Sequence, residues 1–189
     1  IIAIEGLCRD ITKGVQAEKE LRESEEKFRT FTEMAPVGVF VTDTGGLTTY
    51  WNKRLCEITG MRIVDGLGTG WADGVHPDDR ERVFKEWYES AEKRASFRCE
   101  YRFVDRDGAV THTIGQASPL IDASSRVTGY VGTITDVTDL KQAEVALWES
   151  KDFFTQMFVQ SKTSTQLFDP DGNCIRVNPE FCNLFGVTE

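Results

Sequence analysis

The chain repeats itself along its length. When the 189 residues are aligned with themselves at an offset of 126 positions, 15 of the 63 overlapping positions are identical, without a gap. The identities fall in two groups, with residues 6–28 matching 132–154 and residues 43–60 matching 169–186. One repeat is therefore 126 residues long. We expect a piece of a longer protein that begins in the tail of one copy and stops partway into the next.

Composition excludes several classes of protein. The chain has 22 Lys and Arg against 31 Asp and Glu, a net charge of −9, and so lacks the basic surface that nucleic-acid binding requires. The longest apolar stretch, residues 35–41, is far shorter than the roughly 20 residues that span a bilayer. Five cysteines without a C-x-x-C pair indicate reduced, packed thiols and no zinc site. We expect a cytoplasmic protein with no nucleic-acid, membrane or metal site in this segment.

Residues 13–31 and 139–157 are predicted to form helices with a narrow apolar seam. In the second copy the seam positions follow a 3-4-3-4 spacing with charged neighbours: Leu140, Ala143, Leu147, Ser150 and Phe154. This spacing is typical of a coiled coil and favours a homodimer, whereas a short amphipathic helix packed on its own domain is the alternative. The small residues in the seam indicate a weak zipper that can change register.

The segments between these helices alternate between strands and short helices. Residues 37–51 predict a hairpin, and Asn52 predicts the cap of a helix that ends at Gly60. We interpret the glycine-rich residues 66–71 as a loop, because they follow no strand and lack the remainder of a nucleotide-binding motif. Another helix is expected from His76, since proline and acidic residues follow it. Residues 97–103, 110–120 and 127–135 predict three antiparallel strands.

The ordered motifs resemble the PAS domain with its C-terminal PAC motif. They are Trp71…His76-Pro-Asp-Asp79, Glu100-Tyr-Arg102, Asp107-Gly108 and Gly129-Tyr-Val-Gly-Thr-Ile-Thr-Asp-Val-Thr138. The resemblance implies an α+β fold, a five-stranded antiparallel sheet with helices on one face, flanked by coiled-coil linker helices. The implied division is the last strand of a preceding PAS domain (1–12), a linker helix (13–31), a complete PAS/PAC domain (32–138), a second linker helix (139–157) and the beginning of a following domain (158–189).

PAS domains serve as sensory and dimerisation modules, so the resemblance implies a signalling role. It implies a relay of a ligand-induced or conformational change to the neighbouring domains, in a parent that is a two-component sensor histidine kinase. The alternative is a ligand-free dimerisation spacer in a diguanylate cyclase or another signalling protein. No residue pattern in this segment predicts catalysis.

Four side chains are candidates for lining a ligand pocket: Cys56, Tyr101, His112 and Tyr130. The ligand itself is unknown. A flavin adduct is disfavoured because Asn173-Cys174 is not followed by the residues of the flavin-binding relatives. A c-type haem is disfavoured too, and His76 is interpreted as a helix cap and not as a haem ligand. Redox sensing by Cys56 is a further alternative to simple packing.

A strand that ends in Asp-x-Thr directly before a helix is the candidate signal relay. In the complete copy these residues are Asp136 and Thr138, and in the preceding copy Asp10 and Thr12. Either side chain is expected to cap the helix that follows and to tie it to the sheet.

Overall fold

The computed structural model describes residues 12–187, with the backbone alone for residues 12–14. The chain divides into two compact units, one up to Val137 and the other from Thr138 onward, and each is described by itself. Of the strand expected within residues 1–12, residues 1–11 lie outside the described residues, and Thr12 is the first residue of a helix.

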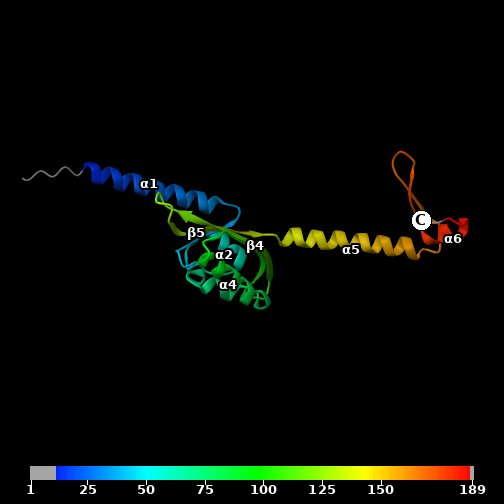
Figure 1. Ribbon diagram of the computed structural model, residues 1–189, viewed down its shortest axis with the longest axis horizontal. Coiled ribbons are helices and arrows are strands. Elements are labelled where there is room, and N and C mark those ends of the chain that lie inside the picture. The colour runs from blue at the N-terminus through cyan, green and yellow to red at the C-terminus, as the bar shows by residue number, and fades with distance from the viewer. Residues whose placement is uncertain (1–11, 188–189) are drawn as a thin grey trace, which may run out of the picture. The chain divides into compact units, whose positions relative to one another are not determined.

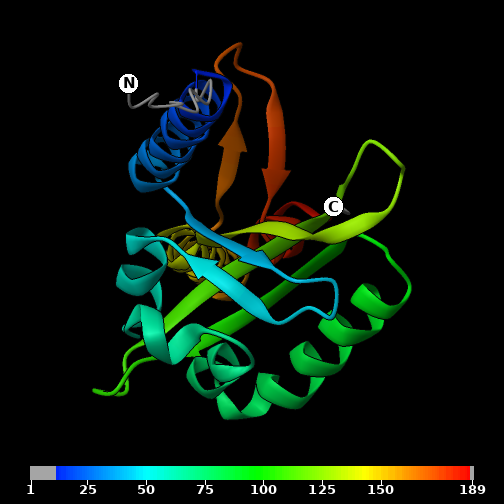
Figure 2. The ribbon, with the colours of Figure 1, turned by 90° about the vertical axis from the view of Figure 1, so that its left-hand side faces the viewer.

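The first unit is a five-stranded antiparallel sheet with the helices of residues 53–92 on one face (Figures 1 and 2). Its strands lie in the order β2-β1-β5-β4-β3, which confirms the predicted fold class. The elements are α1 (Thr12–Met34), β1 (Gly38–Thr42), β2 (Thr48–Trp51), α2 (Lys53–Thr59), α3 (Ile63–Gly66), the 3₁₀ helix η1 (Gly70–Gly74), α4 (Pro77–Glu92), β3 (Phe97–Val104), β4 (Val110–Ile121) and β5 (Val127–Asp136).

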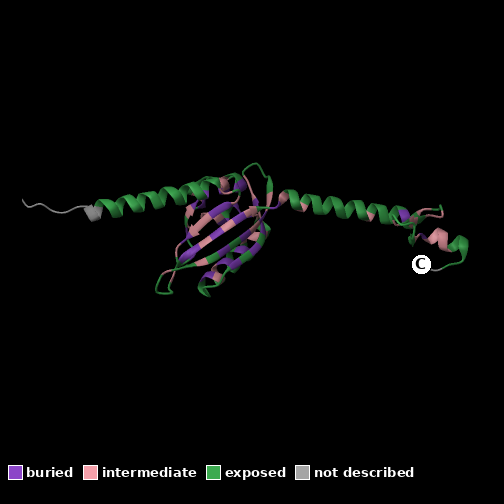
Figure 3. Ribbon diagram, turned by 90° about the horizontal axis from the view of Figure 1, so that it is seen from above, coloured by how far each residue is buried: buried purple, intermediate pink, exposed green. Residues whose placement is uncertain are grey.

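The core lies between the sheet and helices α2 and α4. Along β3 the buried residues alternate with more exposed ones, as Figure 3 shows by the banded colouring of the strands. Trp87 of α4 stands at the centre, with its ring in edge contact with Phe40, Phe97 and Tyr130 at centroid distances of 5.3–6.0 Å. Burial of these large apolar rings is the main force that fixes α4 on the sheet.

Local sequence signals account for the ends of the helices. Asn52 caps α2 by accepting a hydrogen bond from the backbone N–H of Leu55, and Gly60 ends it in the left-handed conformation with φ 68°. His76 caps α4, where Pro77 occupies the first turn. These predictions are confirmed.

The loop predicted for residues 66–71 is wrong at both ends. Gly66 is the last residue of α3, and Gly70 is the first of η1. Gly66 is needed there because a Cβ atom at this position would collide with the ring of Trp51. Gly66 therefore allows α3 to pack closely against a buried tryptophan, and Gly70 allows the start of η1 to approach the carbonyl of Asp65. Only residues 67–69 connect the two short helices.

The second unit contains α5 (Thr138–Gln160), β6 (Gln166–Phe168), β7 (Cys174–Val177) and α6 (Pro179–Phe185). It reproduces bonds of the first unit at positions 126 residues further along. Asp169 accepts two backbone N–H bonds in its turn as Asp43 does, and Gly172 and Gly46 both have φ near 85°. The two segments therefore form the same kind of turn, held by equivalent hydrogen bonds.

Both linker helices are longer than predicted, spanning residues 12–34 and 138–160. Each gains a last turn that is anchored to its own unit. Thr32 is buried near the end of α1 and meets the hydroxyl of Tyr50 at 2.6 Å. At the matching position of α5, Phe158 is buried beneath the guanidinium of Arg176. No helix in the described part of the chain has the length and apolar character needed to cross a membrane.

The side chain of Asn52 is fully buried and makes four hydrogen bonds. Its Oδ1 accepts from the N–H of Val39 and of Leu55, while its Nδ2 donates to the carbonyls of Thr32 and Val37. It therefore joins the end of α1, the start of β1 and the start of α2.

We predict that Asn52→Asp lowers the free energy of unfolding by about 2 kcal/mol or more. Aspartate is as good a helix cap as asparagine, but an ionised carboxylate cannot donate to the two carbonyls and is buried here. Urea unfolding followed by tryptophan fluorescence measures the loss. A change of less than about 0.5 kcal/mol would mean that Asn52 is only a cap.

Candidate functional site

A cavity of about 40 Å³ lies inside the first unit, between the sheet and the helices. Its walls are almost entirely aromatic and aliphatic. The lining residues are Phe40, Thr48, Trp51, Leu55, Trp71, Val83, Trp87, Phe97, Tyr101, Phe103 and Ile134. Among them Tyr101 alone has an ionisable side chain. The cavity is therefore an uncharged space at the centre of the core.

Two tryptophans in the cavity wall differ in their hydrogen bonding. The Nε1–H of Trp87 donates to the carbonyl of Gly46 at 3.0 Å and so fastens α4 to the turn between β1 and β2. The Nε1–H of Trp51 is buried and has no acceptor among the described residues. An unpaired buried donor is rare in native proteins and calls for an explanation.

Tyr101 is the predicted pocket residue that does line the cavity. Its ring lies across Gly115 of β4, where a Cβ atom would come within 2.8 Å of the hydroxyl oxygen. Burial raises the pKa of Tyr101, with a smaller contribution from Cys99, so its hydroxyl stays neutral at physiological pH.

The other three predicted pocket residues lie away from the cavity wall. Tyr130 is buried, but its hydroxyl donates to the carbonyl of Ala91 and is used in holding the end of α4. Cys56 packs at the edge of the core, and burial, followed by the charge of Glu33, raises the pKa of its thiol. A raised pKa disfavours the reactive thiolate that redox sensing by Cys56 would need. His112 is half-buried on β4, opposite Arg102.

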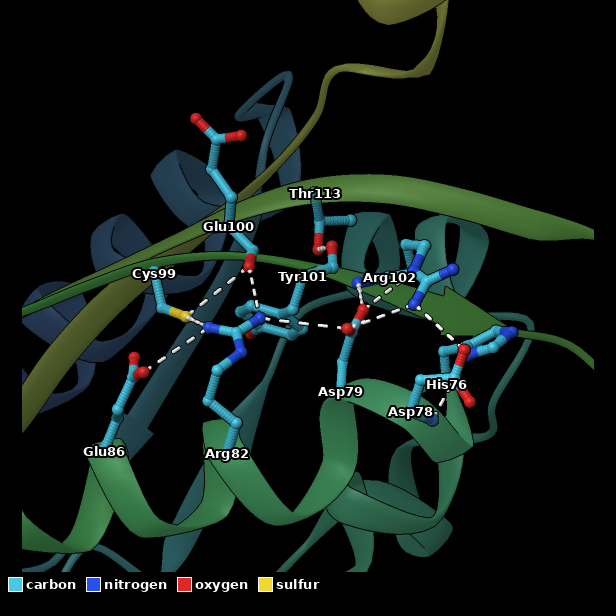
Figure 4. Close-up of polar contacts among 10 residues, drawn as sticks. All are labelled: His76, Asp78, Asp79, Arg82, Glu86, Cys99, Glu100, Tyr101, Arg102 and Thr113. Atoms are coloured by element: carbon cyan, nitrogen blue, oxygen red, sulfur yellow. Dashed lines mark hydrogen bonds and ion pairs between the residues drawn. The ribbon is translucent and has the colours of Figure 1, made fainter.

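A cluster of polar residues fastens the start of α4 to β3 (Figure 4). Asp79 accepts from the backbone N–H of Arg102 at 3.0 Å and from its Nε at 2.8 Å, and a third bond joins its other oxygen to Nη2. The bonds from Arg102, more than any other cause, hold the pKa of Asp79 below its usual range. Asp79 is therefore an anion held by a guanidinium fork.

Arg82, one turn further along α4, makes a second bridge to β3 (Figure 4). Its Nη1 lies 2.8 Å from the sulfur of Cys99, and its Nη2 donates to the carbonyl of Glu100 at 2.9 Å. Burial raises the pKa of the Cys99 thiol to about 11, so the sulfur is a neutral acceptor and not a nucleophile. The cluster is suited to holding α4 in place and not to catalysis.

His76 has a structural role in the same cluster. Its Nδ1 accepts from the backbone N–H of Asp78 at 3.3 Å, which confirms the prediction that it caps the helix. Among residues 12–187, no group of three or more His, Cys, Asp or Glu side chains is arranged to hold a metal ion.

At the predicted relay, strand and helix follow each other almost without a break. Asp136 is the last residue of β5 and Thr138 is the first of α5. Val137 between them is buried, and its N–H donates to the carbonyl of His112 at 2.8 Å. In the other copy, Asp10 lies outside the described residues, and for Thr12 only the backbone, the first residue of α1, is described.

The predicted seam of α5 is uncovered in the single chain. Leu140, Leu147 and Phe154 are each at least half exposed, and Ala143 and Ser150 are exposed as well. Large apolar side chains in such a row normally mark an interaction surface.

Sequence reasoning missed most of the residues that form the cavity wall. Trp51, Trp71 and Trp87 were not predicted to line a pocket, although three tryptophans within 37 positions were a signal of an aromatic core. The bond between Asp79 and Arg102 joins residues 23 positions apart, and no sequence pattern pairs them.

Strand order, helices α2 and α4 on one face of the sheet and an aromatic cavity beneath them together define an α+β module with an apolar core cavity. Residues 48–134 match the family described as the PAS fold. These residues therefore form a PAS domain, and relatives of the chain include signalling proteins, among them a histidine kinase and a two-component sensor.

Similar proteins include several from signalling systems. The chain is 32% identical over 139 residues to protein y4lL of Sinorhizobium fredii, covering 74% of this chain and 17% of that protein. It is 30% identical to the peroxide stress-activated histidine kinase mak1 of Schizosaccharomyces pombe, covering 61% of this chain and 7% of that protein. It is 24% identical to the two-component sensor PprA of Pseudomonas aeruginosa, covering 99% of this chain and 20% of that protein. The chain thus spans a fifth or less of the length of these relatives.

Solved structures share the fold. A sensory box histidine kinase/response regulator from Burkholderia thailandensis aligns with a TM-score of 0.51 and 26% identity, covering 69% of this chain and 98% of that one. A PAS domain from Colwellia psychrerythraea aligns with a TM-score of 0.50 and 20% identity, covering 64% of this chain and 98% of that one.

We predict that Asp79→Asn lowers the free energy of unfolding at neutral pH by about 1.5–3 kcal/mol, because charge-assisted bonds to Arg102 are lost. Since the pKa of Asp79 is lowered by folding, its contribution is present above the unfolded value near 3.9 and is lost as the pH falls through the folded value. The stability difference between wild type and variant should therefore shrink below about pH 4.

Asp78→Asn is the matched control, since Asp78 is exposed and meets Arg102 only at 3.5 Å. Its effect should stay within about 0.5 kcal/mol at every pH. Chemical unfolding at a series of pH values measures both variants. A difference between Asp79→Asn and wild type that does not change with pH contradicts the role given to the ion pair.

Proposed function

We propose that this chain is a sensory and relay segment of a cytoplasmic multidomain signalling protein. An event in the core cavity of the PAS domain shifts β5, and the junction at residues 136–138 passes that shift to α5. The parent is proposed to be a two-component sensor histidine kinase, with support from the similarity to the histidine kinase mak1 and the two-component sensor PprA.

The observation that carries the proposal is the path from cavity to helix. Ile134 lines the cavity and belongs to β5, a strand hydrogen-bonded on both sides, to β1 and to β4. Only Val137 separates Asp136, the end of this strand, from Thr138, the first residue of α5. A packed strand transmits displacement with little loss, and a coupling of about 1–3 kcal/mol is enough to switch output.

A homodimer through the linker helices completes the relay. The exposed seam of α5 (Leu140, Ala143, Leu147, Ser150 and Phe154) supports pairing with a second copy. Alanine and serine at two of the five positions weaken the pairing, so alternative registers lie close in energy. This is the property that a helix needs in order to respond to a small shift.

Residues 158–189 are proposed to begin a following PAS domain. Asn178 is buried and makes four bonds as Asn52 does, with each of its two acceptor bonds shifted by 126 positions, to the N–H of Thr165 and of Phe181. The neighbours of α5 in the chain would then be two sensory modules, with an output domain beyond them.

A ligand-free spacer in a diguanylate cyclase or another signalling protein is the second candidate, and the small volume of the cavity supports it. Native mass spectrometry of freshly purified protein distinguishes the two. Mass in excess of the chain supports the sensor, and a dimer of bare chains supports the spacer.

For the relay, we predict that replacing Asp136 and Thr138 together by Ala uncouples input from output in the parent protein while the domain stays folded. The reason is that both residues lie where the strand becomes a helix. The measurement is output activity with and without stimulus, alongside circular dichroism of the variant. Regulation that survives unchanged in a folded double variant overturns the relay.

For the dimer, we predict that Leu147→Gln weakens self-association about 100-fold, because two copies of a seam leucine leave the interface. Trp148→Gln is the control, since Trp148 is the neighbouring residue, is similarly exposed and lies outside the seam. Sedimentation equilibrium measures both. Equal weakening by the two variants would show that the seam is not the interface.

A further inference from the structure

The two edge strands of the sheet, β2 and β3, are covered in different ways. At β2 the cover is backbone, because Thr48 and Gly68 exchange two hydrogen bonds of 2.8 and 3.0 Å. At β3 side chains of α4 contribute to the cover. The edge of a strand is a row of backbone donors and acceptors to which another strand can bind. What covers β3 therefore decides whether a second chain can pair with it.

The backbone groups of every second residue in β3 point away from β4 and toward this edge. The carbonyl of Tyr101 accepts a hydrogen bond from the hydroxyl of Thr113 on β4, so it faces the neighbouring strand. Because the direction alternates along a strand, the groups of Arg98, Glu100 and Arg102 face the edge.

Backbone covers the far end of this edge. The N–H of His76 donates to the carbonyl of Arg102 at 2.8 Å, and Val75 forms a bridge with Phe103. The edge is therefore closed to another strand from residue 102 onward, and residues 97–101 are the stretch that a second chain can reach.

The side chain of Arg82 lies across that remaining stretch (Figure 4). Its Nη2 donates to the carbonyl of Glu100 at 2.9 Å, and its Nη1 lies 2.8 Å from the sulfur of Cys99. The side chain is 46% exposed and flexible, so it can swing into solvent, whereas a backbone bridge cannot. Arg82 is thus a removable cover over the carbonyl that a second strand would need.

The charges on residues 97–101 suit pairing with the same residues of a second copy. Arg98 and Glu100 are exposed, whereas Phe97, Cys99 and Tyr101 belong to the core. Antiparallel pairing centred on residue 99 sets Arg98 of each copy opposite Glu100 of the other. Opposite charges directly across a ladder are stabilising, and two-fold symmetry gives this pair twice. The stretch is therefore complementary to itself.

We propose that residues 97–101 of β3 are a pairing surface for the same residues of a second copy, and that Arg82 holds this surface closed. When Arg82 leaves the carbonyl of Glu100, the sheets of two copies join edge to edge. This surface is separate from the α5 seam, and the inference goes beyond the proposed relay and does not depend on it.

Arg82→Met tests the proposal, because methionine keeps an apolar stem and cannot donate to the carbonyl of Glu100. Helix α4 keeps the bonds of Asp79 to Arg102 and the packing of Trp87, so the variant should fold. Circular dichroism and urea unfolding check this.

Lys85→Met is the matched control. Lys85 lies on the same helix, carries the same charge, and its side chain is 75% exposed. Both variants are made in the full chain carrying Leu147→Gln, so that association through the α5 seam does not hide the effect. Sedimentation equilibrium should show that Arg82→Met self-associates at least about tenfold more tightly than Lys85→Met.

Amide hydrogen exchange locates the contact. In Arg82→Met, the amides of Arg98 and Glu100 should exchange at least about tenfold more slowly at high protein concentration than at low concentration, because pairing protects them. The amide of Tyr101 faces β4 and is the internal reference. Its exchange should not change with concentration.

A second substitution tests the charge pairing. Glu100→Lys, added to Arg82→Met, sets a lysine opposite Arg98 of the second copy, and like charges across a ladder are destabilising. Self-association should then fall to the level of the Lys85→Met control. Glu92→Lys makes the same charge change at an exposed position outside β3 and should leave the association of Arg82→Met intact.

Equal self-association of folded Arg82→Met and Lys85→Met overturns the inference. Association without protection of Arg98 and Glu100 overturns it too, because the contact then lies elsewhere, as does association that Glu100→Lys leaves unchanged. If Arg82→Met unfolds, Arg82→Ala takes its place in the same comparison, since alanine has the highest helix propensity.

Discussion

A single buried amide fixes how this domain is assembled. Asn52 has two acceptor bonds and two donor bonds, and its partners come from the end of α1, the segment before β1, β1 itself and α2. An amide is one of the few neutral side chains able to donate and accept at once, so neither Asp nor Leu could replace it. Because these four partners are backbone groups, the arrangement depends little on neighbouring side chains. This explains why Asn178 repeats three of the four bonds 126 positions further along among quite different residues, with its fourth bond to the carbonyl of Ser161.

The cavity is a consequence of how the sheet is filled. Tyr101 and Phe103 point from β3 toward the helices, and small residues face the same side on the neighbouring strand β4: Thr113, Gly115 and Ala117. The large rings therefore take the space over β4. The Asp79–Arg102 and Arg82–Cys99 contacts then hold α4 above these rings. The polar contacts of Asp79 and Arg82 hold the first turns of α4 on β3, and Trp87 holds the helix on the sheet further along. The cavity lies between the helix and the sheet.

The sequence was sufficient for local structure because local structure depends on neighbours in the chain. Asn52, Gly60, His76 and Pro77 marked helix ends, and the alternation from Phe97 to Phe103 marked β3. On β4 the same rule points the wrong way, since the apolar Ile114 is the more exposed residue while Thr113 and Gly115 on either side of it are buried. The pattern is reversed because the large ring of Tyr101, on the neighbouring strand β3, fills the space over Gly115. Which residues of β4 face the core therefore depends on how β4 pairs with β3, and the sequence of β4 alone does not show this pairing. For this reason His112 was predicted for the pocket and Trp51 was not.

The proposed relay depends on a rigid strand, β5, that leads into a weakly specified helix seam on α5. Ile134 lines the cavity, and β5 is hydrogen-bonded to a strand on each side. Because the sheet is tightly packed, a displacement of Ile134 moves the whole strand. Two residues later the ladder ends at Asp136, and Val137 keeps one bond to His112 before α5 begins. The seam of α5, by contrast, alternates large residues with alanine and serine. In the proposed relay, a stiff strand leads directly into a helix whose pairing with a second copy is loosely specified. A small shift would then become a choice between registers, because packed interfaces change between discrete arrangements and do not deform continuously.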